Sequence, residues 1–147
     1  MNRLRILLVD DSAPDLELAE AAFAEYHDTA DLMTRASAAD ALSALYDPTG
    51  TPPDVVVLDI NMPVMSGLEL LRVIKTDPVL QCIPVVMLSN SSSEQDVAQA
   101  YTLHASSYLV KAHNFQDFLQ QVEDFVHYWC RCRLPPHPSD PTHLSGT

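Results

Sequence analysis

Five short apolar runs, separated by amphipathic segments, constrain the fold more than any other feature of this sequence. The runs lie at 4–9, 31–36, 54–59, 83–88 and 107–110. All but the second lack polar alternation, which is typical of strands buried on both faces of a parallel sheet. The second run is more polar and fits an edge strand. Five strands alternating with five helices predict a doubly wound α/β sandwich.

Each segment between or after these runs opens with a helix start signal. In four of them a serine is followed three residues later by an acid, and Asn114 can cap the last helix. Pro14 fits the first turn of its helix. An apolar stripe at helical spacing indicates one buried face on the last helix. The serines are Ser12, Ser37, Ser66 and Ser93, and the stripe comprises Phe115, Phe118, Leu119, Val122, Phe125, Val126 and Trp129.

The chain length of 147 residues fits a single domain with a proper core. We expect this domain to span residues 1–130. Residues 131–147 are expected to form a flexible tail, because the segment is rich in proline and has no apolar periodicity. No apolar run is long enough to cross a bilayer or to form the core of a signal peptide. We therefore expect a cytoplasmic protein.

The charge and the glycine content exclude several functions. The formal net charge of −12 argues against nucleic acid as a partner and favours a basic protein surface or a metal cation. The three glycines are far apart, so neither of the usual glycine-rich phosphate loops can be formed.

Several side chains that could carry chemistry are expected to be inert. Lys75 is predicted to be a solvent-facing charge on a helix. His104 and His113 are expected near the functional edge of the sheet, as solvated side chains rather than metal ligands. Cys130 and Cys132 could form a redox or metal pair, but surface thiols near a helix end are the simpler interpretation.

Polar side chains follow four of the five apolar runs where each predicted strand ends. Asp10 and Asp11 follow the first run, Asp59 ends the third, Ser89 follows the fourth and Lys111 follows the fifth. Ligands bind at the carboxyl ends of the strands in an open parallel sheet. Three carboxylates this close repel one another unless a cation is present, and Mg²⁺ suits carboxylate oxygens. The sequence thus predicts a cation site at this edge.

Four motifs together resemble the receiver domain of two-component response regulators, the fold of the bacterial chemotaxis regulator. They are 6-ILLVDDS-12, 57-VLDINMPVMSGLELL-71, 85-VVMLSNSS-92 and 107-SYLVKA-112, and the resemblance covers residues 4 to 129. It implies a flavodoxin-like (βα)5 fold with strand order 2-1-3-4-5. The tryptophan near the chain end and 14-PDLELAEAAF-23 are similar to small regulators paired with phytochrome-type sensor kinases.

The resemblance implies a role for each residue at the edge of the sheet. Asp59 matches the phosphoacceptor, which attacks a phosphohistidine of a sensor histidine kinase. Asp10 and Asp11 match the acidic pair that holds Mg²⁺, together with Asp59 and the backbone carbonyl of Asn61. Lys111 matches the lysine that offsets charge on the phosphoryl oxygens.

Two further residues match the switch of the family, and two positions depart from its pattern. Ser89 matches the switch hydroxyl and Tyr108 the aromatic switch, which would move the surface around residues 93–129. Ala112 stands where the family usually has a proline after a cis bond; a cis bond without proline is costly, and the sequence leaves both isomers of the bond after Lys111 open. Asn90 stands where a smaller residue is common.

The resemblance implies a stand-alone phosphoacceptor module rather than an enzyme. The apolar run 125–134 could bury its surface in a homodimer through the last helix. Two alternatives remain open. One is a degenerate receiver that acts by shape without phosphorylation. The other is a metal-dependent phosphatase with an aspartate nucleophile, although Asn61 occupies the position where those enzymes place a second acid.

Overall fold

The computed structural model describes residues 3–136, which form a five-stranded parallel sheet in the order β2-β1-β3-β4-β5. The predicted fold class and strand order are therefore confirmed, and the polar second run is an edge strand. The strands are β1 (Leu4–Val9), β2 (Ala30–Arg35), β3 (Val55–Leu58), β4 (Val85–Ser89) and β5 (Ser107–Val110).

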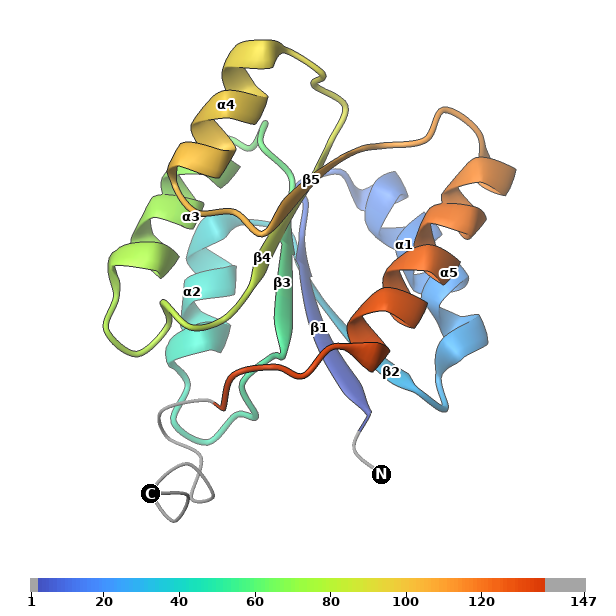
Figure 1. The fold of residues 1–147 in the computed structure, drawn as a ribbon, viewed down its shortest axis with the longest axis horizontal. Coiled ribbons are helices and arrows are strands. Elements are labelled where there is room, and N and C mark those ends of the chain that lie inside the picture. The colour runs from blue at the N-terminus through green and yellow to red at the C-terminus, as the bar shows by residue number, and fades with distance from the viewer. Residues whose placement is uncertain (1–2, 137–147) are drawn as a thin grey trace.

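Helices cover both faces of the sheet (Figure 1). Helices α1 and α5 lie over one face, and α2, α3 and α4 lie over the other. Successive strand residues point to opposite faces, so each central strand contributes to two separate apolar layers. The helices are α1 (Ala13–Phe23), α2 (Ala38–Tyr46), α3 (Gly67–Thr76), α4 (Glu94–Thr102) and α5 (Phe115–Arg131), with a short 3-10 helix at Ala24–Tyr26.

All five predicted caps are present at the helix starts. In each helix the cap side chain accepts a hydrogen bond from the backbone N–H of the acid three residues later. At Ser66 the bond is reciprocal, because the Glu69 carboxylate also accepts from the Ser66 N–H. These bonds fix where the helices begin, and with them the turns that follow β1, β3, β4 and β5.

The apolar stripe of α5 packs on β1, β3 and β4 from the α1 side. Its buried members are Val122, Phe125, Val126 and Trp129. Phe115 was expected in the stripe but is 45% exposed, at the first position of the helix. The helix ends at Arg131, and Cys132 and Leu134 still contact this apolar layer. The predicted tail lies mostly in residues 137–147, outside the described part of the chain.

Two further sequence-based expectations are wrong. Lys75 is half-buried, and its ammonium donates hydrogen bonds to the carbonyl oxygens of Gln81 at 3.0 Å and Ile83 at 2.6 Å. Burial lowers the pKa of this lysine. His104 has φ 71° and follows the end of α4. It therefore lies near the amino-terminal ends of the strands, whereas the strand-end acids lie at the carboxyl-terminal ends. None of the helices within residues 3–136 is long and apolar enough to cross a membrane.

Candidate functional site

Parallel pairing of β1 with β3 brings two of the strand-end aspartates together. Val9 is paired with Leu58, and the Asp59 N–H donates to the Val9 carbonyl at 3.0 Å. Asp10 and Asp59 therefore emerge side by side, each directly after a strand that is buried on both faces. Both carboxylates are buried, with residue exposures of 3% and 7%.

Three carboxylates form one group at this edge. Single oxygens of Asp10, Asp11 and Asp59 lie within 4.8 Å of one another, and Asp11 is exposed. Burial is the main cause that raises the pKa of Asp59, and the charge of Asp10 adds to it. The charge of Lys111 and hydrogen bonding oppose the increase. Such concentrated negative charge on oxygen ligands, open to solvent on one side, fits a divalent cation.

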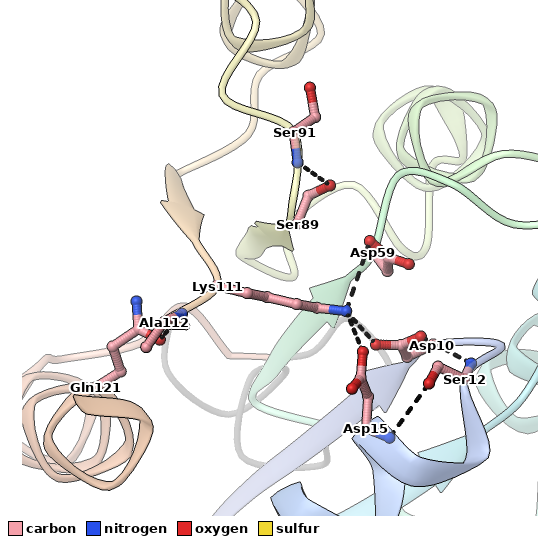
Figure 2. Close-up of polar contacts among 9 residues, drawn as sticks. All are labelled: Asp10, Ser12, Asp15, Asp59, Ser89, Ser91, Lys111, Ala112 and Gln121. Atoms are coloured by element: carbon pink, nitrogen blue, oxygen red, sulfur yellow. Dashed lines mark hydrogen bonds and ion pairs between the residues drawn. The ribbon is translucent and has the colours of Figure 1, made fainter. Parts of the chain in front are cut away.

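Lys111 reaches this group from the end of β5 (Figure 2). Its ammonium lies 2.7 Å from Asp10 Oδ2, 2.8 Å from Asp15 Oδ2 and 3.9 Å from Asp59 Oδ1. Burial alone would lower the pKa of Lys111, but its contacts with the three carboxylates raise it above the ordinary value. The lysine is therefore a fixed positive charge on one side of the acidic group.

Sequence reasoning missed the role of Asp15 in this arrangement. Asp15 was noticed only as part of the cap that begins α1, and that cap is present. The turn also orders Asp10, whose Oδ1 accepts a hydrogen bond from the Ser12 N–H at 2.9 Å. The spacing to Asp10 could have suggested a fourth acid near these strand ends, but nothing local indicated contact with Lys111.

The turn after β3 brings Gly67 against the backbone of Asp59. The Gly67 N–H donates to the Ile60 carbonyl at 2.8 Å, which closes the loop from β3 to α3. A Cβ atom on Gly67 would lie 1.9 Å from the backbone oxygen of Asp59, so only glycine fits. Asn61 lies in this loop and is exposed, and Val64 at its tip has φ 69°.

The predicted switch residues are linked through the loop that follows β4. Ser89 is fully buried, and its hydroxyl accepts a hydrogen bond from the Ser91 N–H at 3.3 Å. The Tyr108 hydroxyl donates to the Ser91 carbonyl at 2.7 Å, and its ring packs on the α2–α4 side of the sheet. Asn90, between the two serines, is exposed. Both switch residues thus bond to the backbone of Ser91, Ser89 to its N–H and Tyr108 to its carbonyl.

The peptide bond after Lys111, which the sequence left open, is trans. Gln121 of α5 bridges this loop, a contact that the sequence did not suggest. Its side-chain oxygen accepts from the Ala112 N–H at 3.1 Å (Figure 2). Its amide donates to the Val110 carbonyl at 2.7 Å. A proline at 112 would have no N–H to offer. Gln121 therefore holds the backbone on both sides of Lys111.

Comparison with known proteins identifies the class. Residues 6–123 match the response regulator receiver domain family, and the chain belongs to it. A receiver domain is a phosphoacceptor signalling module rather than a catalytic enzyme, so the alternative of a metal-dependent phosphatase is set aside.

The similar proteins include regulators linked to phytochromes. Response regulator Rcp1 of Synechocystis is 40% identical over 77 residues, which are 52% of each chain. The crystal structure of phosphorylated RcpA, a cyanobacterial phytochrome response regulator, has a TM-score of 0.86 and 32% identity, and covers 92% of this chain and all of that one.

A second solved structure bears on the cation. The Mn²⁺-bound form of Rcp1 has a TM-score of 0.83 and 32% identity, covering 90% of this chain and 99% of that one. Together with the three carboxylates, this similarity supports a divalent-cation site in the present chain. The chain spans about half the length of the curated relatives that it matches first.

Proposed function

We propose that Asp59 accepts a phosphoryl group from a phosphohistidine of a sensor histidine kinase. One Asp59 oxygen would attack the phosphorus, the P–N bond would break, and its electron pair would return to the imidazole of the kinase. The observation that carries this proposal is the position of Asp59, buried at the end of β3 beside Asp10, with Lys111 3.9 Å away. Positioning and charge neutralisation are what phosphoryl transfer requires.

The cation in this proposal is Mg²⁺, held by Asp10, Asp11, Asp59 and the backbone carbonyl of Asn61. A bound Mg²⁺ would offset the negative charge of the phosphoryl oxygens. The grouping of three carboxylate oxygens within 4.8 Å supports this set, and the exposure of Asp11 leaves room for water ligands.

Ser89 and Tyr108 are proposed to transmit phosphorylation to the surface formed by α4, β5 and α5. A phosphoryl group on Asp59 offers strong acceptor oxygens to the buried Ser89 hydroxyl, which now accepts from the Ser91 N–H. A shift of this loop would also disturb the bond from Tyr108 to the Ser91 carbonyl. Phosphorylation would therefore bias a two-state loop rather than deform the whole domain.

The kinase partner is proposed to be of the phytochrome-associated type, on the strength of the similarity to RcpA and Rcp1. Such a partner implies a cytoplasmic location.

A homodimer through α5 is proposed because apolar side chains remain exposed along that helix and β5. Tyr128 is 63% exposed and Val110 39%. Analytical ultracentrifugation with and without phosphorylation tests this, and a concentration-independent monomer in both states would rule it out.

Intact-mass measurement after incubation with acetyl phosphate and Mg²⁺ tests the phosphoacceptor role. The expected result is the mass gain of one phosphoryl group, lost in Asp59→Asn and absent when a chelator removes Mg²⁺. If no mass is gained, the alternative of a receiver that acts without phosphorylation takes its place. If the gain persists in Asp59→Asn, another residue is the acceptor.

A further inference from the structure

The ammonium of Lys111 is shared between two carboxylates, and one of them has no assigned role. Its distance to Asp15 Oδ2 is 2.8 Å, almost the same as to Asp10 and more than 1 Å shorter than the 3.9 Å to Asp59. The Lys111 side chain is only 11% exposed, whereas the Asp15 side chain is 37% exposed. The lysine is thus held on the α1 side of the site.

Helix capping does not require this contact. Asp40 occupies the same position in α2 as Asp15 does in α1, three residues after a capping serine, and it faces solvent. Side chains in the first turn of a helix point back toward its N-terminus. Because Ser12, the cap of α1, directly follows Asp11, that direction carries the Asp15 carboxylate to the strand ends where Lys111 enters.

Asp15 and Asp59 compete for the positive charge of the Lys111 ammonium. When the ammonium pairs with Asp15, less of its positive charge reaches Asp59, and the cation site keeps more negative charge. A phosphoryl group on Asp59 would add negative charge and attract the same ammonium. A cavity of about 220 Å³ borders Asp10, Asp15 and Lys111 but not Asp59, so the open space beside the lysine side chain lies on the α1 and α5 side of the site.

We propose that Asp15 is a positioning residue that holds Lys111 away from Asp59 in the resting protein. It favours binding of the divalent cation and opposes the phosphorylated state, because Lys111 must leave Asp15 to contact the phosphoryl group. This inference rests on the proposed role of Asp59 as the phosphoacceptor.

Calorimetric titration of Asp15→Asn with Mg²⁺, and then with the phosphoryl analogue trifluoroberyllate at saturating Mg²⁺, tests the proposal. The Mg²⁺ dissociation constant should rise and that of trifluoroberyllate should fall, each by about three- to tenfold, the range for losing a partly exposed, hydrogen-bonded ion pair. A purely structural role would weaken both ligands together. The matched control Asp40→Asn should change neither constant, and Asp15→Glu, which keeps the charge, should restore both toward wild type.

A double variant shows whether the effect passes through Lys111. In a Lys111→Met background, Asp15→Asn should change the Mg²⁺ dissociation constant by less than about twofold, since no ammonium remains to be redistributed. An undiminished effect in that background, or equal shifts in Asp15→Asn and Asp40→Asn, would overturn the proposal. If the wild-type protein binds neither Mg²⁺ nor trifluoroberyllate, the proposed function itself fails, and the role of Asp15 with it.

Discussion

Gly67 lies directly against the backbone of Asp59, at a distance that leaves no space for a side chain. A Cβ atom at position 67 would lie 1.9 Å from the Asp59 carbonyl oxygen and 2.8 Å from its carbonyl carbon. The first residue of α3 therefore limits where the end of β3 can go. The proposed acceptor is held both by the strand that carries it and by the helix that follows.

Gly67→Ala should consequently lower both stability and phosphorylation. Relieving the overlap requires the backbone of Asp59 or of α3 to shift, and such overpacking costs about 1–3 kcal/mol in the free energy of unfolding. Urea denaturation measures the first effect, and the rate of mass gain from acetyl phosphate measures the second. Gly50→Ala is the control, because a Cβ there would meet Asp47 at an ordinary 3.4 Å. Equal behaviour of the two variants would contradict the prediction.

Asp59→Asn should stabilise the cation-free protein at neutral pH. Burial raises the pKa of Asp59 above its ordinary value of 3.8, so the folded state binds more protons than the unfolded state between the two values. The free energy of unfolding therefore falls as the pH rises through that window. Asparagine removes this cost, and Tm should rise by roughly 2–4 °C for each kcal/mol relieved.

Thermal melts across pH, recorded with a chelator, check that sign. The advantage of Asp59→Asn should shrink as the pH falls below 3.8, where the wild-type carboxyl is protonated in both states. Asp11→Asn is the comparison, since that carboxylate is exposed and its removal relieves less. A wild-type protein that is the more stable of the pair at neutral pH would contradict the assigned direction.

Gln121→Ala should loosen the loop that carries Lys111. The variant leaves the Ala112 N–H and the Val110 carbonyl without their side-chain partner, which should cost about 1–2 kcal/mol. Phosphorylation from acetyl phosphate should slow as well, because the Lys111 ammonium is then less well positioned. Gln120→Ala is the matched control, since that side chain bonds only to Asp124 on the helix surface. An unchanged rate in Gln121→Ala would show that the bridge is structural alone.

Lys75→Met should destabilise the connection between α3 and β4. Its ammonium donates to the carbonyl oxygens of Gln81 and Ile83, and methionine supports neither bond while keeping most of the apolar length. The expected loss is about 1–3 kcal/mol in urea denaturation. Arg72→Met, an exposed change on the same helix, should stay within about 0.5 kcal/mol of wild type. If both variants melt alike, the two hydrogen bonds of Lys75 contribute nothing.

The parts of the fold that depend on local signals could be predicted from the sequence. Apolar runs and capping serines act within a few residues, and β1 and all five helix caps lie where they were expected. The carboxyl ends of parallel strands lie at one end of the sheet, so the strand-end acids were expected together, whereas the strand order was implied by the resemblance to the receiver family. Local signals thus sufficed to bring Asp10, Asp59 and Lys111 to one edge.

Contacts between distant elements could not be predicted in the same way. Lys111 and Asp15 are 96 residues apart, and their pairing depends on how α1 and β5 meet at the edge of the sheet. Gln121 reaches Ala112 only because α5 turns back along β5. The sequence around Lys75 indicates an ordinary surface charge. In the structure its ammonium donates to the Ile83 carbonyl in the loop before β4, a contact that no local signal predicts.

The two apolar layers on opposite faces of the sheet have no buried side chain in common. Substitutions inside one layer can therefore be absorbed without repacking the other. Helix α4 lies over one layer and α5 over the other, with the exposed edge of β5 between them. A lineage carrying this fold could diversify the solvent-facing side of either helix independently, while the strand ends that hold Asp10 and Asp59 stay in place.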